Sequence, residues 1–173
     1  MCILASISHK YTIFAHVIMR LNSMQPLNLP PIKPRLKTEQ GRQKIWDGLR
    51  RQYVVLTPEE WVRQHFTAFL VEEMGYPSAL MANEVGITLN GMSRRCDTVV
   101  YGNDLRPRMI IEYKRPNVKI VQRVFDQICR YNIVMQVDYL IVSNGLEHYC
   151  CRMNYQTNTY EFVNQIPRYS EIM

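Results

Sequence analysis

The chain has 173 residues, of which 47% are hydrophobic and 21% charged, and its formal net charge is +6. This length supports one domain with a core that needs no disulfide or structural metal, and the composition excludes fibrous and intrinsically disordered classes. The five cysteines form no CxxC pair and the four histidines lack a metal-binding spacing. The sequence therefore indicates neither a disulfide framework nor a zinc or imidazole metal site, and it favours a reducing cytoplasmic compartment.

Basic residues are concentrated in two stretches. Residues 24–56 contain seven basic residues against two acidic ones, and residues 94–130 contain nine against four. A polyanion is the natural partner of such a surface, because neutralising phosphates releases counterions and supplies sequence-independent affinity. A merely solvated basic surface is the alternative.

The first 56 residues are expected to lie outside the main domain. The apolar runs in residues 1–23 are too short to cross a bilayer and lack the pattern of a secretory signal, so we interpret this stretch as an upstream in-frame extension before a start at Met24. Four prolines within residues 25–34 predict an extended arm. Residues 37–51 predict a strand pair or an irregular cover segment, followed by a short extended run. We therefore interpret residues 24–56 as a basic, proline-rich arm.

A main domain is predicted over residues 57–173, and it begins with a helix. Thr57 at the N-cap, Pro58 at the first helical position and Glu60 at the third form a capping box. Apolar residues then recur at spacings of three and four, until Gly75 and Pro77 end the helix.

Strand patterns follow this helix. Residues 84–89 and 94–101 predict two antiparallel strands joined by an Asn-Gly turn, and residues 109–114 predict a third. A helical stripe over residues 120–134 then leads to an apolar strand at 137–142. Strand, helix and strand in this order imply a right-handed crossover and a parallel pairing.

Two more strands close the predicted sheet, at residues 148–153 and 159–163. The fold class is therefore α/β, a mixed β-sheet flanked by helices on both faces.

Ionisable residues within two of these strands predict a functional site. Glu112 and Lys114 share one face of their strand, because side chains alternate. If the strand of Asp97 pairs with it through the turn at 102–107, a second carboxylate comes alongside. Two carboxylates and a lysine form a plausible site for a divalent metal with a cation beside it, and such a site can cut phosphodiesters. On the following helix, Gln127 and Tyr131 share a face.

These residues match the D-(spacer)-E-x-K signature of the PD-(D/E)xK nuclease superfamily, although Cys96 replaces the usual proline before the aspartate. Gln127 and Tyr131 resemble the Q-x-x-x-Y element of its RecB-like and type I restriction branches. From residue 57 to 169 the motifs run Pro-Glu-Glu-x-Val-Arg-Gln, Gly-Tyr-Pro, Arg-x-Asp-x-Val-Val-Tyr, Ile-Glu-x-Lys, Asp-Gln-x-x-x-Tyr-Asn and Ser-Asn-Gly. This order is similar to the N-terminal nuclease domain of type I restriction enzyme R subunits, in a stand-alone form.

The resemblance implies a restriction-endonuclease-like fold and Mg²⁺-dependent cleavage of DNA, with Mn²⁺ as the alternative ion. It implies that Asp97 and Glu112 bind the metal. Lys114 would orient or activate the water and stabilise transition-state charge, and Gln127 and Tyr131 would position active-site groups.

Structural alternatives remain open for each of these residues. Asp97 could be a strand-end residue bridged to a neighbouring arginine, and Glu112 with Lys114 an exposed ion pair of little energetic value. Gln127 and Tyr131 could simply belong to a packed helix face.

An acidic residue on the first helix can complete the metal site in the family. Glu60 is the position that matches, although its place in the capping box explains it equally well. Glu84 is a weaker candidate.

No G-x-x-x-x-G-K-[ST] phosphate loop occurs in the sequence, so the chain cannot translocate DNA by itself. DNA is the predicted partner, together with separate motor or specificity subunits, and no membrane association is expected. The alternative function is a catalytically inactive nucleic-acid-binding module of the same fold, and a third is a structural or regulatory interaction domain. The sequence does not indicate an oligomeric state.

Overall fold

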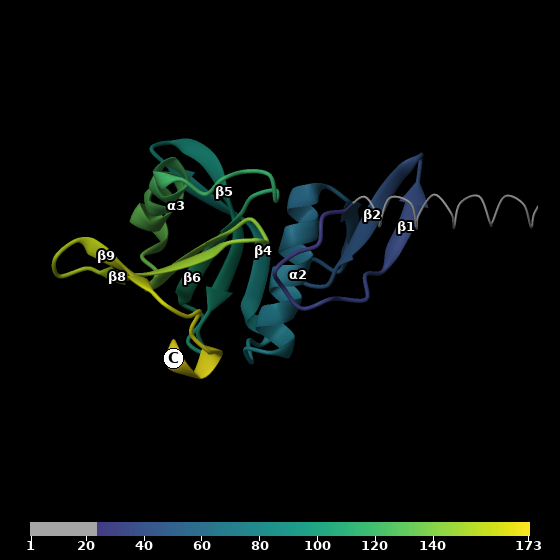
Figure 1. Ribbon diagram of the computed structural model, residues 1–173. Coiled ribbons are helices and arrows are strands. Elements are labelled where there is room, and N and C mark those ends of the chain that lie inside the picture. Colours follow the sequence, from purple (N-terminus) through teal and green to yellow (C-terminus); the bar gives the residue numbers. More distant parts are fainter. Residues whose placement is uncertain (1–23) are drawn as a thin grey trace, which may run out of the picture.

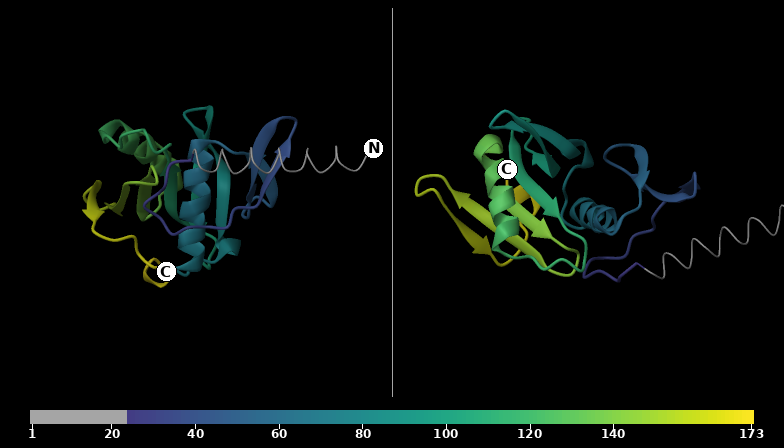
Figure 2. Two further views of the ribbon diagram at one scale, coloured as in Figure 1. Left: turned by 45° about the vertical axis from the view of Figure 1, so that its right-hand side comes forward. Right: turned by 90° about the horizontal axis from the view of Figure 1, so that it is seen from above.

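The computed structural model describes residues 24–173, so the prediction for residues 1–23 lies outside it. The described chain forms two β-sheets with helix α2 (Pro58–Glu72) between them (Figures 1 and 2). The small sheet is antiparallel and consists of β1 (Leu36–Glu39), β2 (Arg42–Asp47) and β3 (Gln52–Val55). In the part of the chain that is described, no helix is long and apolar enough to span a membrane.

The large sheet has six strands in the order β4-β5-β6-β7-β8-β9. Its strands and short helices are β4 (Met81–Leu89), β5 (Met92–Tyr101), β6 (Pro107–Tyr113), β7 (Tyr139–Ser143), β8 (His148–Asn154), β9 (Thr159–Val163), η1 (Ser78–Leu80) and η2 (Tyr169–Glu171). Neighbouring strands are antiparallel except for β6 and β7, which are parallel and are connected through α3 (Gln122–Met135). The predicted crossover and parallel pairing are confirmed.

Helix α2 begins where the sequence predicts. The hydroxyl oxygen of Thr57 accepts a hydrogen bond from the amide of Glu60 at 3.0 Å, and Pro58 takes the first turn, where a missing N–H costs nothing. The other half of the predicted capping box is replaced, because the carboxylate of Glu60 accepts hydrogen bonds from Arg50, Arg63 and Gln64. These donors hold Glu60 to the side of the helix that faces the small sheet.

The two helices cover opposite faces of the large sheet, as predicted. On one face Phe66 of α2 packs in a buried cluster with Ile111 and Tyr113 of β6. On the other face Ile128 of α3 packs in a second cluster with Ile110 of the same strand. Alternation along β6 thus sends successive side chains into two cores, which explains why the strand is an almost unbroken apolar run.

Residues 24–56 contain the small sheet. The strand-pair alternative is the one observed, as β1 and β2, and the predicted extended run forms β3, which pairs with the free edge of β2. The proline-rich stretch contributes Leu27 and Leu29 to the core beside α2, and the amide of Asn28 donates to the carbonyl of Gly145 at 2.7 Å. This stretch is extended, as its prolines predict, but it is packed against the domain.

Candidate active site

The site forms where the pairing of β5 and β6 ends. The last regular pair joins Thr98 to Ile111, so Asp97 and Glu112 follow next on the two strands. The side-chain oxygen Oδ2 of Asp97 accepts a hydrogen bond from the backbone amide of Tyr113 at 2.8 Å. A carboxylate therefore replaces a backbone carbonyl at the end of the ladder and lies beside Glu112.

The neighbouring strand is also irregular at this point. The register of β4 and β5 passes from Asn83 opposite Thr98 to Val85 opposite Cys96, and it omits the pair of Glu84 and Asp97 between them. Glu84 has a φ of 60°, a left-handed conformation that few residues other than glycine adopt. Such conformations are concentrated at functional sites.

Glu112 connects the sheet to α3. Its side chain is 5% exposed, and its Oε1 atom accepts hydrogen bonds from Lys114 Nζ and Gln127 Nε2, each at 2.7 Å. The Gln127 amide nitrogen also lies 3.2 Å from the hydroxyl of Tyr131. Four of the residues predicted from the sequence therefore form one network. The Oε2 atom of Glu112 has no hydrogen-bond donor among residues 24–173.

Asp97 and Glu112, which we call the carboxylate pair, hold an excess of negative charge in a buried place. Burial raises the pKa of Glu112 to about 7, and the charge of Asp97 adds to this increase, whereas Lys114 opposes it. Burial also raises the pKa of Asp97, against the effect of Arg63. Two like charges in a low-dielectric site disfavour each other's ionisation, and a bound cation would relieve both.

A second acidic residue of the first helix, Glu59, lies within the electrostatic influence of this pair. Burial and the charge of Asp97 raise the pKa of Glu59, and Lys114 lowers it. Glu60 is held instead by Arg63 at 2.7 Å, Gln64 at 2.8 Å and Arg50 at 3.1 Å. Glu60 as a metal ligand stays a prediction that these contacts do not favour.

A sequence signal for Glu59 exists. It stands three positions before Val62 and seven before Phe66, and residues at these spacings lie on one helical stripe. Because Val62 and Phe66 pack onto the sheet, Glu59 had to point the same way.

The donor set suits a hard divalent cation. No group of three or more His, Cys, Asp or Glu side chains is arranged to hold a metal ion by itself anywhere in residues 24–173. Mg²⁺ does not require such a cage, because it keeps several waters and binds one or two carboxylates together with substrate phosphates. The free Oε2 of Glu112 and the remaining lone pairs of Asp97 fit that coordination.

The chain matches a known family. A family model described as type I restriction enzyme R protein N terminus covers residues 58–167, more than half of the sequence. The chain belongs to this family. The matched region contains Asp97, Glu112 and Lys114.

A solved structure has a similar fold to this R-protein N-terminal domain. It is a fragment of a protein described as an HsdR subunit of a type I restriction enzyme from Vibrio vulnificus YJ016, with a TM-score of 0.51 and 18% sequence identity. The match covers 68% of this chain and 24% of that one, so this chain spans about a quarter of the other's length. No curated protein matches the sequence.

A second group of acidic residues lies beside the carboxylate pair of this family member. We call it the arginine cluster, because two arginines pair with its three carboxylates. Its members are Asp47, Glu60, Glu84, Arg50 and Arg63. The Arg63 side chain is only 5% exposed, and its guanidinium contacts Glu60 at 2.7 Å and Glu84 at 2.8 Å. Burial opposes the charge of Arg63, but the surrounding carboxylates raise its pKa above the ordinary value.

Arg63 joins the two acidic groups, and the sequence did not identify it. Its Nη2 atom donates to Asp97 Oδ1 at 2.9 Å, so Asp97 pairs with a helix residue and not with Arg94 or Arg95 of its own strand. A buried arginine cannot be distinguished from an exposed one by residue type, and this one occurs within a helix of otherwise amphipathic pattern.

Proposed function

We propose that this domain hydrolyses phosphodiester bonds of DNA with a divalent metal ion held by the carboxylate pair. The observation that carries the proposal is the buried pair itself, in which Glu112 has a raised pKa and a free Oε2 beside the amine of Lys114. A structural ion pair would have no reason to keep two carboxylates together where each disfavours the other's charge.

Mg²⁺ is the proposed ion, with Mn²⁺ as the alternative, bound by Asp97 and Glu112 with Glu59 turned toward them. When bound, it would polarise the phosphate and lower the pKa of a coordinated water. The protein's own part is to fix the ligands: the Tyr113 amide orients Asp97, and Gln127 and Lys114 both hold one oxygen of Glu112. The other oxygen is thereby directed away from these donors.

Lys114 is suited to stabilise charge. Burial lowers the pKa of Lys114, but the charges of Glu112, Glu59 and Asp97 raise it by a larger amount. The net shift is upward, so the amine stays protonated at neutral pH. An ammonium group cannot accept a proton from water. Its role in this proposal is therefore to donate hydrogen bonds to the negative charge that develops on the phosphate.

Gln127 and Tyr131 are proposed as positioning residues. The amide of Gln127 lies between Glu112 and the Tyr131 hydroxyl, at 2.7 and 3.2 Å. Because α3 carries both residues, the helix fixes the rotamer of the carboxylate.

The proposed partners are DNA and separate motor or specificity subunits, in the cytoplasm. The family description names R proteins of type I restriction enzymes, and this chain contains no phosphate-loop motif of its own. We propose cutting, without translocation, as the task of this domain.

The test is nicking of supercoiled plasmid with Mg²⁺ or Mn²⁺. We expect Asp97→Asn and Lys114→Ala to lower the rate by at least about 100-fold, as the loss of a transition-state donor or metal ligand does. Asp104→Asn and Lys119→Ala change exposed residues of the same types and should keep wild-type activity. Equal nicking by all five proteins would refute the assignment. Salt-dependent DNA binding without any cleavage would favour the inactive binding module.

A further inference from the structure

The outer face of the small sheet combines cations with aromatic rings. In its register Lys37 lies opposite Lys44 and Trp46 lies opposite Tyr53, and opposed residues of antiparallel strands share a face. The residues that alternation assigns to this face are Arg35, Lys37, Glu39, Arg42, Lys44, Trp46, Tyr53 and Val55. Four of them are cationic and one is acidic. We call this set the outer face.

The opposite face of the sheet is the one that packs against the domain. Leu36, Ile45 and Val54 are opposed in the register, and Ile45 is buried. Of the two acidic residues in β1 and β2, Asp47 also turns inward, where it pairs with Arg50 and accepts from Asn83 of β4 at 2.8 Å. The inward turn of Asp47 leaves the outer face with a surplus of positive charge.

Cations lie directly over the rings of the outer face. The guanidinium carbon of Arg35 is 4.7 Å from the Trp46 ring centroid, and Lys37 Nζ is 4.6 Å from that of Tyr53. The two rings meet edge to face at 5.2 Å. Aromatic rings and cations are thus combined in one place, as they are in proteins that bind unpaired nucleotides.

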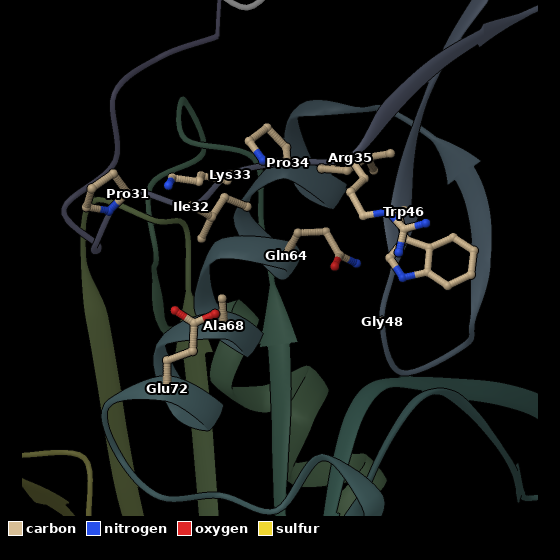
Figure 3. Close-up of a pocket in the computed structure, with 11 residues that line it drawn as sticks. Pro31, Ile32, Lys33, Pro34, Arg35, Trp46, Gly48, Gln64, Ala68 and Glu72 are labelled. Carbon is tan, nitrogen blue, oxygen red and sulfur yellow. The ribbon is translucent and has the colours of Figure 1, made fainter.

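A cavity of about 420 Å³ opens beside Trp46, between the small sheet and α2 (Figure 3). Trp46 lines one side of it, and Gln64 and Ala68 of α2 line the other. Lys33 and Ile32 of the extended stretch lie above α2 in the same view. The Gln64 amide nitrogen donates to Glu60, which leaves its carbonyl oxygen as an acceptor beside the cavity. The lining combines apolar side chains with charged ones, because Lys33, Arg35 and Glu72 also border the cavity.

We propose that the outer face and this cavity bind single-stranded DNA, with a base stacked on Trp46 and the backbone phosphates on the flanking cations. The inference rests on the proposed function for the choice of DNA as the ligand. It adds that the DNA held near the cleavage site is single-stranded. Duplex DNA hides its base faces by stacking, so that aromatic side chains gain contact only with an unpaired strand. An acidic peptide would use the cations and leave the rings without a role.

The position of the outer face connects it to the carboxylate pair. Asp47 fixes β2 to β4 through Asn83, and Arg50 joins the small sheet to Glu60 at the start of α2. A strand bound on the outer face would therefore lie on a sheet that is joined to β4 and to the start of α2, the helix that carries Glu59.

Binding is measured by fluorescence anisotropy of a labelled oligo(dT) in EDTA at low salt, so that cleavage cannot contribute. We expect Trp46→Ala to weaken binding roughly tenfold and Arg35→Gln or Lys44→Gln to reduce both affinity and its salt dependence, while Trp46→Phe retains most affinity. Trp61→Phe is the matched control, because it changes the chain's other tryptophan, on α2. Unchanged binding in folded Trp46→Ala protein would overturn the proposal.

Trp46 also reports directly, which keeps the test decisive if Trp46→Ala does not fold. In Trp61→Phe protein the emission comes from Trp46 alone, and oligo(dT) should quench it while a duplex of equal length should not. Absence of quenching at saturating oligo(dT), or equal quenching by duplex DNA or by oligo(U), would overturn the assignment. Cleavage with no Trp46 response would refute this proposal and spare the nuclease. Quenching of Trp46 without cleavage would support this proposal and refute the nuclease function.

Discussion

Two neighbouring groups of buried carboxylates in this domain are treated in opposite ways. In the arginine cluster, Asp47 is fully buried, yet hydrogen bonds from Arg50 and Asn83 outweigh the burial and lower its pKa. In the carboxylate pair, Glu112 is almost as deeply buried, and its pKa rises to about 7. Within residues 24–173 its salt bridges are one between Lys114 and Glu112 and one between Arg63 and Asp97.

The difference identifies where positive charge is missing. A fold that needs acids only for architecture can neutralise them with arginines, as the arginine cluster does, and burial then costs little. The carboxylate pair has fewer cations around it, and in the proposed function a bound metal ion supplies the missing positive charge. Variants in each group therefore test whether the two sites differ in kind.

The largest effect is expected from removing the cation that the two groups share. Arg63→Met would remove the buried cation that contacts Glu60, Glu84 and Asp97, and breaking such pairs costs about 3–5 kcal/mol. Urea unfolding at pH 7 measures the loss. Arg95→Met is the control, because the Arg95 side chain is 66% exposed and its pair with Glu84 is worth less than about 1 kcal/mol. Equal effects of the two variants would contradict the burial argument.

Replacing a glutamate with glutamine should change the free energy of unfolding in opposite directions in the two groups. Between pH 4.5 and about 7 the folded protein binds a proton at Glu112 that the unfolded chain releases, so the stability from this group is present below pH 4.5 and lost as the pH rises through about 7. At pH 8 in EDTA, Glu112→Gln should stabilise the fold by roughly 3 kcal/mol at most, with little effect at pH 4.

Glu60→Gln should destabilise at pH 8, because it removes the charge that faces Arg50 and Arg63. Guanidinium unfolding of both variants at the two pH values is the measurement. Destabilisation by Glu112→Gln at pH 8 would show that the carboxylate pair is already neutralised.

A divalent ion should supply the missing charge. At ten times its dissociation constant, Mg²⁺ or Mn²⁺ should stabilise the wild-type protein by about 1.4 kcal/mol at pH 8. The effect should shrink at pH 6, because Glu112 then holds a proton that the ion must displace. Thermal shifts should vanish in Glu112→Gln, weaken in Glu59→Gln and persist in Glu60→Gln. A shift lost in Glu60→Gln but kept in Glu59→Gln would restore Glu60 as the helix ligand.

The smallest effect is expected at the helix cap. Thr57→Ala removes the acceptor of the Glu60 amide and should cost about 1 kcal/mol, whereas Thr57→Ser should cost little. Because the first turn carries Glu59 toward the carboxylate pair and Glu60 toward the arginine cluster, metal affinity should fall in parallel with stability. Unfolding and metal titration of the two variants decide this.

The sequence predicted the elements whose pattern is local. The large sheet, its parallel pairing and both helices were recognisable because Ile111, Ile128 and their neighbours follow strand and helix periods. Glu112, Lys114, Gln127 and Tyr131 were identified together because motif spacing places them on adjacent elements, and the structure brings them into one network.

What the sequence missed depends on distant contacts. The four-residue strands of the small sheet are too short for alternation to be recognised, so the extended run that forms β3 was predicted but its pairing with β2 was not. Arg63 acquires its role only because Glu84 breaks the ladder opposite Asp97. Glu59 was not considered from the sequence, because which flank of α2 meets the large sheet is a question of tertiary packing.

The extended stretch before β1 has a consequence for dissecting the molecule. Leu27 lies so close to Gly145 that a β-carbon there would meet it at 2.7 Å, and His148 Nε2 lies 3.0 Å from the carbonyl of Asn28. The region that matches the family begins 31 positions after Leu27, at Pro58. A fragment cut at that boundary would uncover the β7–β8 turn and lose Arg50 and Asp47. The region that matches the family model is thus shorter than the part of the chain that packs together, and expression plasmids should start ahead of Leu27.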